Sequence, residues 1–555
     1  MREKPAIVQS DGTILLFVES PLFKEARERF SAFAELIKAP DYVHTYKITP
    51  ISLWNAAAMG ISSQQVIEIL QEYSSYTVPE NIIVQVKEYI ERYGRVKMVR
   101  KDDNIHLIAD DPAIGDLIFS DKKAAGYIEE KISSREFRIK KYARGHLKLF
   151  LVKMGYPVED WAGYSPGTPF KFKLTDLKLR PYQVDAIESF YAGGSERGGS
   201  GIVVLPCGAG KTIVGIGVME KLQTETLIIV TSTVAARQWK DELLRWTSIS
   251  PEDIGEYSGD RKEIRPVTIA TYNILIHRKG ETFSHLGVFD AKNWGLVIYD
   301  EVHLLPAPVF RITAEIQAKR RLGLSATLVR EDGKEDEIFA LIGPKKYDAP
   351  WKTFEEKGWI ASALCFEVRV PMPTKIRFEY MKATRRKKFT IASTNPEKIK
   401  ALKKILDLHR KDRILIIGQF ISQLREISKI LKAPLITGST PNIEREKLYN
   451  EFRNDIINIL VVSKVANFAI NLPSANVAIE VSGTFGSRQE EAQRLGRILR
   501  PKEEGRAYFY TIVSRETVDE EYSAKRQIFL TEQGYKYTII NLEDLNEKSS
   551  LSGLL

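Results

Sequence analysis

The 555-residue chain has little cysteine and no long hydrophobic run. Its two cysteines, Cys207 and Cys365, are too few for a disulfide framework or for a zinc site made of four thiolates. Apolar runs such as 14–18 and 227–230 fall far short of the ~18 residues that span a bilayer. Glu19 follows the first apolar run at once, so a secretory signal is not expected. These absences favour a globular protein in a reducing, intracellular setting.

Low-complexity tracts, short-period repeats and zinc-finger patterns are also missing, and the composition is ordinary, with 43% hydrophobic and 28% charged residues. At roughly 150 residues per domain, the length predicts three or four domains. Lysine and arginine outnumber aspartate and glutamate by 82 to 72, which gives a formal net charge of +10. A basic surplus favours polyanionic partners, because phosphate contacts release counterions. Many proteins that never contact nucleic acid are equally basic, so charge alone leaves both classes open.

Short apolar runs alternate with helical stretches in two parts of the chain, about 175–345 and 397–545. Fully apolar strands separated by helices are typical of parallel sheets that are covered on both faces. The runs are 202–205, 227–231, 267–270, 296–299 and 322–325 in the first part, and 414–417, 435–437, 459–463, 477–481 and 508–513 in the second. We therefore predict an α/β fold with two parallel-sheet domains in tandem.

The first 165 residues have a different texture. Apolar residues recur close to helical period over residues 21–38 and again within 66–90. Residues 96–99 and 105–109 are strand candidates on either side of a hairpin-like turn. Glycines and prolines at 163–169 mark a boundary. We predict a mixed α+β region in front of the two sheet domains.

A phosphate-binding loop is the strongest chemical signal. Gly208-Ala209-Gly210-Lys211-Thr212 follows the apolar run 202–205 and opens a helical stretch, as such loops do. The glycines let backbone amides turn toward phosphates, while Lys211 would reach the terminal phosphates and Thr212 would bind Mg²⁺. The strict pattern has glycine six residues before the lysine, where this chain has Leu205. A glycine-rich turn without a ligand is the alternative.

An acidic pair follows the apolar run 296–299. In Asp300-Glu301-Val302-His303 the carboxylates come at the carboxyl end of a strand, where open α/β sheets bind ligands. Asp300 could hold Mg²⁺, and Glu301 could orient and deprotonate an attacking water. Such a pair alone is as often a helix cap, and His303 alone is more often structural. The phosphate loop in the same domain favours nucleotide hydrolysis.

A basic segment lies in the second sheet domain. It runs from Gln493 to Arg500, and Arg497 and Arg500 could neutralise charge on a γ-phosphate. A solvated basic helix face is the alternative. A phosphate loop in one domain and arginines in the other predict a site closed by interdomain motion.

Together these motifs resemble superfamily 2 helicases and, more narrowly, the shorter prokaryotic (archaeal or bacterial) type of the XPB family of DNA repair helicases. The closer match rests on Leu179-Arg180-Pro181-Tyr182-Gln183, on residues 324–332 and 486–497, and on the C-terminal 525–527 and 532–535. The resemblance covers nearly the whole chain. It implies two RecA-like motor domains, ATP and Mg²⁺ as cofactors, and a DNA translocase of 3′ to 5′ polarity. That enzyme would act on duplex, forked or bubble DNA in nucleotide excision repair.

The resemblance also implies roles for single residues. Gln183 would read the adenine edge, with Arg180 and Gln493 in the same ATP site. Coupling of ATP state to DNA is implied for His303, Ser325, Ala326 and Thr327. Strand opening is implied for Arg330, Glu331 and Asp332, which match the family's RED motif. Phosphate contact beside an aromatic residue is implied for a basic run in the position of the family's thumb-like element, Arg385, Arg386, Lys387, Lys388 and Phe389. A solvated basic helix face is the alternative for that run.

The implied domains are a helical accessory domain at 1–95, a damage-recognition-like domain at 96–165, motor domain 1 at 166–348, a linker with the thumb-like element at 349–396, and motor domain 2 at 397–555.

The chain departs from the family pattern at Ala466, Asn467 and Asn471, which stand where eukaryotic members usually have Gly-Asp and an acidic residue. The effect of these three residues on coupling is therefore left open.

Alternative functions and partners remain at this point. The chain could be a duplex translocase that remodels protein–DNA complexes, or one that positions and stimulates a partner nuclease, as archaeal members do, with little strand separation of its own. An RNA helicase is a further alternative. Nothing in the sequence indicates a homo-oligomer or a membrane partner. The prokaryotic resemblance implies a cytoplasmic, nucleoid-associated protein.

Overall fold

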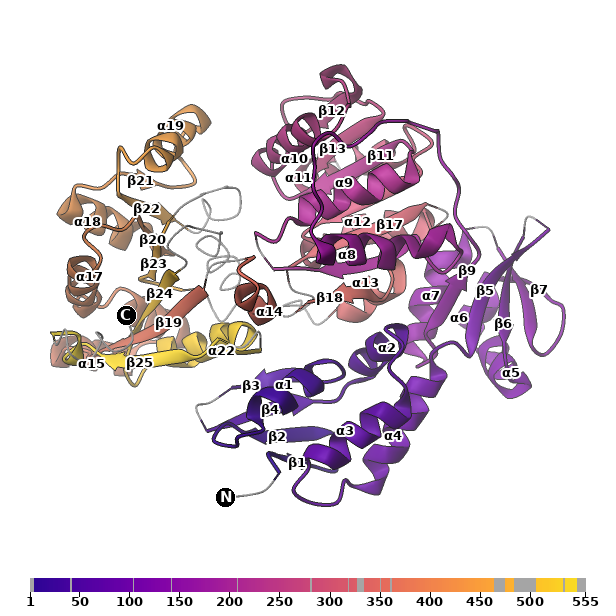
Figure 1. Cartoon of the computed structure of the whole chain (residues 1–555), viewed down its shortest axis with the longest axis horizontal. Helices are drawn as coiled ribbons and strands as arrows, with labels where there is room; N and C mark the ends of the chain where they lie inside the picture. Colours follow the sequence, from indigo (N-terminus) through magenta and orange to yellow (C-terminus); the bar gives the residue numbers. More distant parts are fainter. Residues whose placement is uncertain are drawn as a thin grey trace. The chain divides into compact units, whose positions relative to one another are not determined.

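The structure is a computed structural model, and it describes residues 4–39, 42–102, 104–140, 142–206, 208–279, 282–317, 319–326, 334–349, 351–359, 362–463, 475–483, 506–532 and 535–546. Contacts divide the chain into two compact units (Figure 1). Apart from two short stretches, the first unit is residues 1–348 and the second is residues 349–555. No helix in the described ranges is long and apolar enough to cross a membrane.

The first unit begins with a four-stranded sheet packed with helices. Its strand order is β1-β2-β4-β3. Its elements are β1 (Ala6–Val8), β2 (Thr13–Phe17), α1 (Phe23–Ser31), β3 (Glu35–Lys38), β4 (Val43–Lys47), α2 (Pro50–Ala58), α3 (Ser63–Tyr73) and α4 (Glu80–Arg92). The predicted helix over 21–38 is therefore wrong beyond Ser31, and the predicted helical domain also holds a sheet. Hydrogen bonding of β3 to β4 outweighs the local helical period there.

A five-stranded sheet follows, with the order β7-β8-β6-β5-β9. Its elements are β5 (Val96–Lys101), β6 (Asn104–Ala109), α5 (Pro112–Ser120), α6 (Lys122–Tyr127), β7 (Ile128–Lys131), β8 (Glu136–Ile139), α7 (Ala143–Lys153) and β9 (Val158–Trp161). The predicted hairpin is confirmed, because β5 and β6 pair antiparallel from Val96 opposite Ala109 to Lys101 opposite Asn104. Asp102 has a φ of 46° in the connecting turn.

The first unit ends with a parallel seven-stranded sheet in the order β12-β13-β11-β16-β17-β10-β18. Its strands are β10 (Ser200–Val204), β11 (Thr226–Val230), β12 (Ile254–Tyr257), β13 (Val267–Thr271), β16 (Leu296–Asp300), β17 (Arg320–Ser325) and β18 (Lys345–Asp348). Its principal helices are α8 (Pro181–Tyr191), α9 (Lys211–Leu222), α10 (Thr233–Trp246), α11 (Tyr272–Leu275), α12 (Ala307–Glu315) and α13 (Glu335–Leu341). All five predicted apolar strands are confirmed. The edge strands β12 and β18 were missed, because Ile-Gly-Glu-Tyr and Lys-Lys-Tyr-Asp carry no apolar run.

The second unit holds another parallel seven-stranded sheet, in the order β21-β22-β20-β23-β24-β19-β25 (Figure 1). Its strands are β19 (Ser362–Val370), β20 (Ile414–Gly418), β21 (Leu435–Ile436), β22 (Ile459–Ser463), β23 (Val477–Glu480), β24 (Arg506–Ser514) and β25 (Tyr537–Asn541). Its helices are α14 (Trp351–Glu356), α15 (Thr374–Lys382), α16 (Arg385–Ser393), α17 (Glu397–Leu408), α18 (Ile421–Leu431), α19 (Asn442–Arg453) and α22 (Val518–Glu532). The five predicted strands are confirmed. Residues 349–396 are more than a linker, because β19 lies inside the sheet between β24 and β25.

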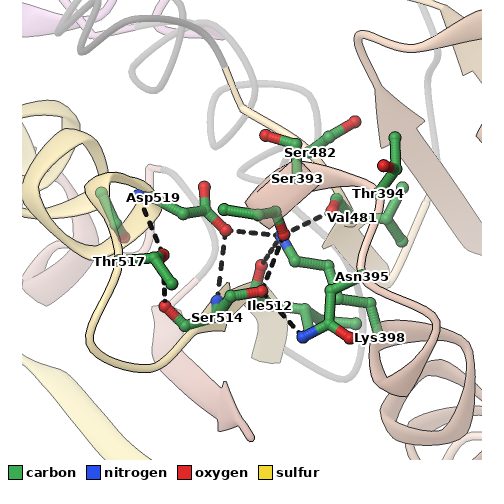
Figure 2. Close-up of polar contacts among 12 residues, drawn as sticks. Ser393, Thr394, Asn395, Lys398, Val481, Ser482, Ile512, Ser514, Thr517 and Asp519 are labelled. Carbon is green, nitrogen blue, oxygen red and sulfur yellow. Dashed lines mark hydrogen bonds and ion pairs between the residues drawn. The ribbon is translucent and has the colours of Figure 1, made fainter. Parts of the chain in front are cut away.

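A buried ion pair joins α17 to α22 in the second unit (Figure 2). The Lys398 Nζ donates to Asp519 Oδ2 at 2.6 Å and to the carbonyl oxygens of Val481 and Ile512 at 3.1 and 2.8 Å. The backbone N of Ser514 donates to the same Asp519 oxygen at 3.2 Å. The side chains of Lys398 and Asp519 are 1% and 0% exposed. These bonds tie the two helices to the carboxyl ends of β23 and β24.

Candidate functional site

The loop between β10 and α9 has the backbone of a phosphate-binding turn. Gly208 and Gly210 have φ angles of 82° and 80°, which residues with a Cβ rarely adopt. A Cβ on Gly210 would also lie 2.6 Å from the Gln183 Nε2. Lys211 is the first residue of α9, so the free amides of that helix terminus lie at the end of the loop. This terminus is suited to bind an anion.

Gln183, the predicted adenine reader, lies beside this loop. It is 6% exposed and occupies the first turn of α8. Its Oε1 accepts a hydrogen bond from the backbone N of Arg180 at 2.9 Å, which fixes the side chain at the start of the helix. Pro181 at the first helical position has no N–H that would need a partner. The structure thus brings Arg180 and Gln183 to the same end of the sheet as the phosphate loop.

The phosphate-loop lysine faces the predicted catalytic carboxylate. The Lys211 Nζ lies 3.5 Å from the Glu301 Oε1, and the two side chains are 11% and 20% exposed. Glu301 follows the last residue of β16 with a φ of 50°, a left-handed conformation that costs a non-glycine residue roughly 1–2 kcal/mol. Its backbone N donates to the Asp300 Oδ1 at 3.1 Å. Strained backbone of this kind concentrates at functional sites.

Asp300 is a half-buried carboxylate at the end of β16. Withdrawal from water and the neighbouring charge of Glu301 together raise its pKa to about 6. The Trp239 indole, which donates to the Asp300 Oδ2 at 2.9 Å, and the charge of Lys211 act in the opposite direction. Asp300 and Glu301 are therefore two neighbouring carboxylates beside the ammonium group of Lys211.

Two residues that hold Asp300 were missed by sequence reasoning. Trp239 of α10 is 1% exposed, and its ring packs on α9 so closely that a Cβ on Gly215 would lie 2.5 Å from it. The Tyr272 hydroxyl donates to the backbone oxygen of Asp300 at 3.2 Å. Buried aromatic residues at helical spacing indicate core packing, and no local motif reveals that these two also bond to a functional carboxylate.

His303 connects the ends of two neighbouring strands. Its Nδ1 lies 2.7 Å from the Ser325 Oγ, at the end of β17, and 3.6 Å from the Glu301 Oε2. His303 and Ser325 are buried, at 4% and 0% exposed. The predicted coupling residues His303 and Ser325 are therefore in contact, and Ala326 follows them in the chain. Thr327 and the RED residues Arg330, Glu331 and Asp332 lie outside the described residues.

The arginine segment is not among the described residues, since Gln493, Arg497 and Arg500 lie outside them, as do Ala466, Asn467 and Asn471.

The basic run at the start of α16 is described. Arg385, Arg386, Lys387 and Lys388 form the first turn of α16, in which the first three are exposed and Lys388 is half-buried. The prediction that Phe389 offers a stacking surface beside them is wrong, since Phe389 is 1% exposed and packs against Phe420 and Tyr522.

The residues at the end of the first parallel sheet fit a Mg²⁺ ion that arrives with phosphates. Asp300 supplies a carboxylate next to that of Glu301, and Thr212 supplies a hydroxyl on the second residue of α9. Oxygen ligands of this kind suit Mg²⁺, which usually takes one or two protein groups and shares the rest with phosphate and water. Within the described residues no group of three or more His, Cys, Asp or Glu side chains could hold a metal by itself.

Comparison with known proteins places the whole chain among helicases. Residues 354–552 match the model of the ERCC3/RAD25/XPB C-terminal helicase. Residues 176–330 match that of the type III restriction enzyme, res subunit, and residues 6–133 match a model described as helicase conserved C-terminal domain.

Full-length relatives agree with these matches. The chain is 50% identical over 550 residues to the DNA 3′-5′ helicase XPB of Kineococcus radiotolerans, with 98% of each chain covered. It is 51% identical over 549 residues to the DNA 3′-5′ helicase XPB of Mycobacterium tuberculosis. This match covers 98% of the present chain and 99% of the relative. The XPB helicase/translocase subunit of the general transcription and DNA repair factor IIH of Schizosaccharomyces pombe is 32% identical, with 98% of this chain and 76% of that one covered. Given this site and these relatives, the chain belongs to the XPB family of helicases.

Proposed function

We propose that this protein is an ATP-dependent DNA helicase that moves 3′ to 5′ along its track. The observation that carries the proposal is the convergence of Lys211, Glu301 and Asp300 at the carboxyl end of one parallel sheet, beside Gln183. A lysine at a helix terminus and an acidic pair are the parts that nucleotide hydrolysis requires. Two bacterial relatives of about half-identical sequence bear the name DNA 3′-5′ helicase.

In this proposal each residue has a separate task. Lys211 and the amides of 208–212 bind the phosphates of ATP, and Gln183 with Arg180 binds the adenine. Thr212 and Asp300 hold Mg²⁺, which offsets phosphate charge when bound. Glu301 orients the attacking water and takes its proton, because its carboxylate is held next to Lys211 and Asp300.

Residues of the later segments complete the proposed cycle. Gln493, Arg497 and Arg500 contribute to the ATP site, where the two arginines neutralise charge on the γ-phosphate. His303 and Ser325 pass the state of Glu301 to the end of β17, since they form a continuous contact with it. Thr327 and the RED residues 330–332 follow directly in the chain and act on DNA.

Contact with DNA is proposed to be electrostatic and independent of sequence. The cations at the start of α16, exposed Arg385 to Lys387 and half-buried Lys388, suit phosphate contacts. Phosphate contacts make binding weaken steeply as salt rises. Nucleotide excision repair is the proposed setting, on the bacterial chromosome, and residues 96–165 are proposed to contribute to damage recognition.

Strand separation on forked DNA tests the proposed function. A fork with differently labelled strands and a 3′ single-stranded arm should be unwound in the presence of ATP and Mg²⁺, and a fork with only a 5′ arm should not. Lys211→Ala is the matched control and should leave both forks intact. Displacement of a protein roadblock from duplex without unwinding would contradict the helicase proposal in favour of a remodelling translocase or a nuclease-stimulating partner. Equal stimulation of ATP hydrolysis by RNA would contradict DNA as the track.

A further inference from the structure

A cavity of about 410 Å³ lies where three parts of the first unit meet, away from the ATP site. The N-terminal part contributes Ala57, Ala58, Gly60 and Tyr93, and the β5–β9 sheet contributes Lys97, Lys148 and the strand β9. The first parallel-sheet domain contributes Arg197, Ser200, Phe339 and Lys346. Cavities of this size at domain junctions hold small organic ligands.

The cavity is separated from the phosphate loop by the length of a strand. Ser200, which lines the cavity, begins β10, and the loop 208–212 follows the other end of that strand. At 3.3 Å per residue the five residues of β10 span about 16 Å. A ligand here would therefore be a second ligand, not a part of ATP.

The lining has more cations than its carboxylates can neutralise. The Glu159 Oε2 lies 3.6 Å from the Lys97 Nζ. The Asp160 carboxylate is bound by Lys148 at 3.1 Å and by Arg144 at 2.7 Å. Both carboxylates of the lining are thus already paired. Arg197 and Lys346 remain, and within the described part of the chain neither has a carboxylate within 4.0 Å.

Lys346 is built into this position. Its aliphatic stem lies on Gly201, where a Cβ would be 2.4 Å from the Lys346 Cγ. Its Nζ donates to the backbone oxygen of Arg197 at 3.0 Å, while the side chain of Arg197 is exposed and its guanidinium lies over the Trp161 ring. Burial lowers the pKa of Lys346, and the nearby charge of Glu159 opposes this shift.

The rest of the lining is aromatic and apolar. The Trp161 ring lies 4.1 Å from the Lys97 Nζ and 5.1 Å from the Arg197 Cζ, measured to the ring centroid. Tyr93, Val152 and Phe339 add an apolar wall that continues into a small hydrophobic cluster with Trp54. A ligand matched to both walls carries an anionic group and a flat or apolar body.

We propose that this cavity binds a phosphate ester the size of a mononucleotide, with its phosphate between Lys346 and Arg197 and its organic part against the aromatic wall. A phosphate between these two cations gains charge-assisted hydrogen bonds from groups that have no carboxylate within 4.0 Å among the described residues. The ligand touches β9 of one sheet and both β10 and β18 of the next. Its binding therefore fastens the β5–β9 sheet to the strand that carries the ATP loop, and it stabilises the folded chain by mass action.

Equilibrium dialysis on the full chain tests the proposal, with the ATP site disabled by Lys211→Ala. The probes are cytidine monophosphate, which lacks the adenine edge that Gln183 is placed to read, and inorganic pyrophosphate. We expect saturable binding of cytidine monophosphate to one site, with a dissociation constant below about 1 mM. Adding Lys346→Gln or Arg197→Gln should weaken it by about tenfold or more, because a charge-assisted hydrogen bond is lost.

Lys345→Gln is the matched control. Lys345 is adjacent on β18 and carries the same charge, but its side chain does not line the cavity and its Nζ pairs with Asp348 at 2.5 Å. It should leave the dissociation constant within about twofold, and cytidine monophosphate should raise the melting temperature only where Lys346 is present. Absence of saturable binding, or equal losses from Lys345→Gln and Lys346→Gln, would overturn the proposal. Binding of pyrophosphate but not of cytidine monophosphate would contradict a nucleotide-sized ester as the ligand.

Discussion

Both parallel sheets bring a lysine and a carboxylate together beyond the ends of their strands, Lys211 with Glu301 at 3.5 Å and Lys398 with Asp519 at 2.6 Å. The two sheets have the same topology, since the strands of each, numbered in chain order, are arranged 3-4-2-5-6-1-7. Each lysine lies in the first turn of the helix that leads into the second strand of its sheet. The two lysines therefore occupy equivalent places, whereas Glu301 follows the fifth strand of its sheet and Asp519 lies on the helix after the sixth.

The difference lies in how the negative charge is compensated. The fifth strand of the first sheet ends in Asp300, whose pKa is raised by burial. The fifth strand of the second sheet ends in Glu480, which is 0% exposed and lies 3.1 Å from the Arg526 guanidinium. Lys398 likewise has Asp519 and two carbonyl oxygens as acceptors. In the second sheet Glu480 and Asp519 each lie beside a buried cation, whereas in the first sheet Asp300 and Glu301 lie together beside Lys211.

The largest expected effect comes from the lysine of the first sheet. Lys211→Ala should lower the turnover of DNA-stimulated ATP hydrolysis by about 10³-fold or more, because the phosphates lose their main protein cation. Phosphate release measures this, and the melting temperature should change little. Turnover within about tenfold of the wild type would remove Lys211 from the site.

Removing the carboxylate of the Lys398–Asp519 pair should act on stability. Asp519→Leu leaves Lys398 buried without its counter-ion and should cost about 3–5 kcal/mol of the free energy of unfolding, measured by denaturant titration. The double variant Asp519→Leu with Lys398→Met is the control and should recover much of the loss, since no charge is then stranded. If Asp519→Leu unfolds at the wild-type denaturant concentration, the pair is not a structural element.

The raised pKa of half-buried Asp300 predicts that stability falls as pH rises. The pKa of Asp300 is raised to about 6, so the folded protein holds this proton more tightly than the unfolded chain. Relative to Asp300→Asn, the wild type without nucleotide should lose stability as pH rises from about 4 to about 6, by at most about 3 kcal/mol. Unfolding curves of both proteins across this range measure the difference. If the difference in free energy of unfolding between the two proteins does not change with pH, the raised pKa of Asp300 is contradicted.

The smallest effect is expected from Trp239, whose indole favours the charged form of Asp300. Trp239→Phe replaces the bicyclic indole by a single aromatic ring and removes the N–H donor. It should raise the pKa of Asp300 further and shift the acidic limb of the ATPase pH profile to higher pH. The lost hydrogen bond should lower the free energy of unfolding by about 1 kcal/mol. Trp246→Phe, on the same helix but bonded to Glu242, is the control and should leave that limb in place.

The sequence predicts the elements that local chemistry determines. Apolar runs locate the strands that lie inside both sheets, and the glycines at 208 and 210 predict the loop that the backbone shows. The acidic pair at 300–301 was placed at the correct end of its strand for the same reason. These signals lie within a few consecutive residues.

The misses have a common physical cause, which is contact between residues far apart in the chain. The strand β3 was taken for the end of a helix, because its pairing with β4 is not visible in its own residues. Phe389 was taken for an exposed aromatic, although Phe420 and Tyr522 cover it. Trp239 and Tyr272 carried no signal, since their bonds to Asp300 cross 61 and 28 positions.

The most direct test of the account is DNA-stimulated ATP hydrolysis by Glu301→Gln, measured together with ATP binding. This substitution keeps the size of the side chain and removes the carboxylate beside Lys211. The Glu301→Gln protein should still bind ATP, while its turnover of ATP on single-stranded, duplex, forked and bubble DNA should be lost. Wild-type turnover in this variant on any of these DNAs would contradict it.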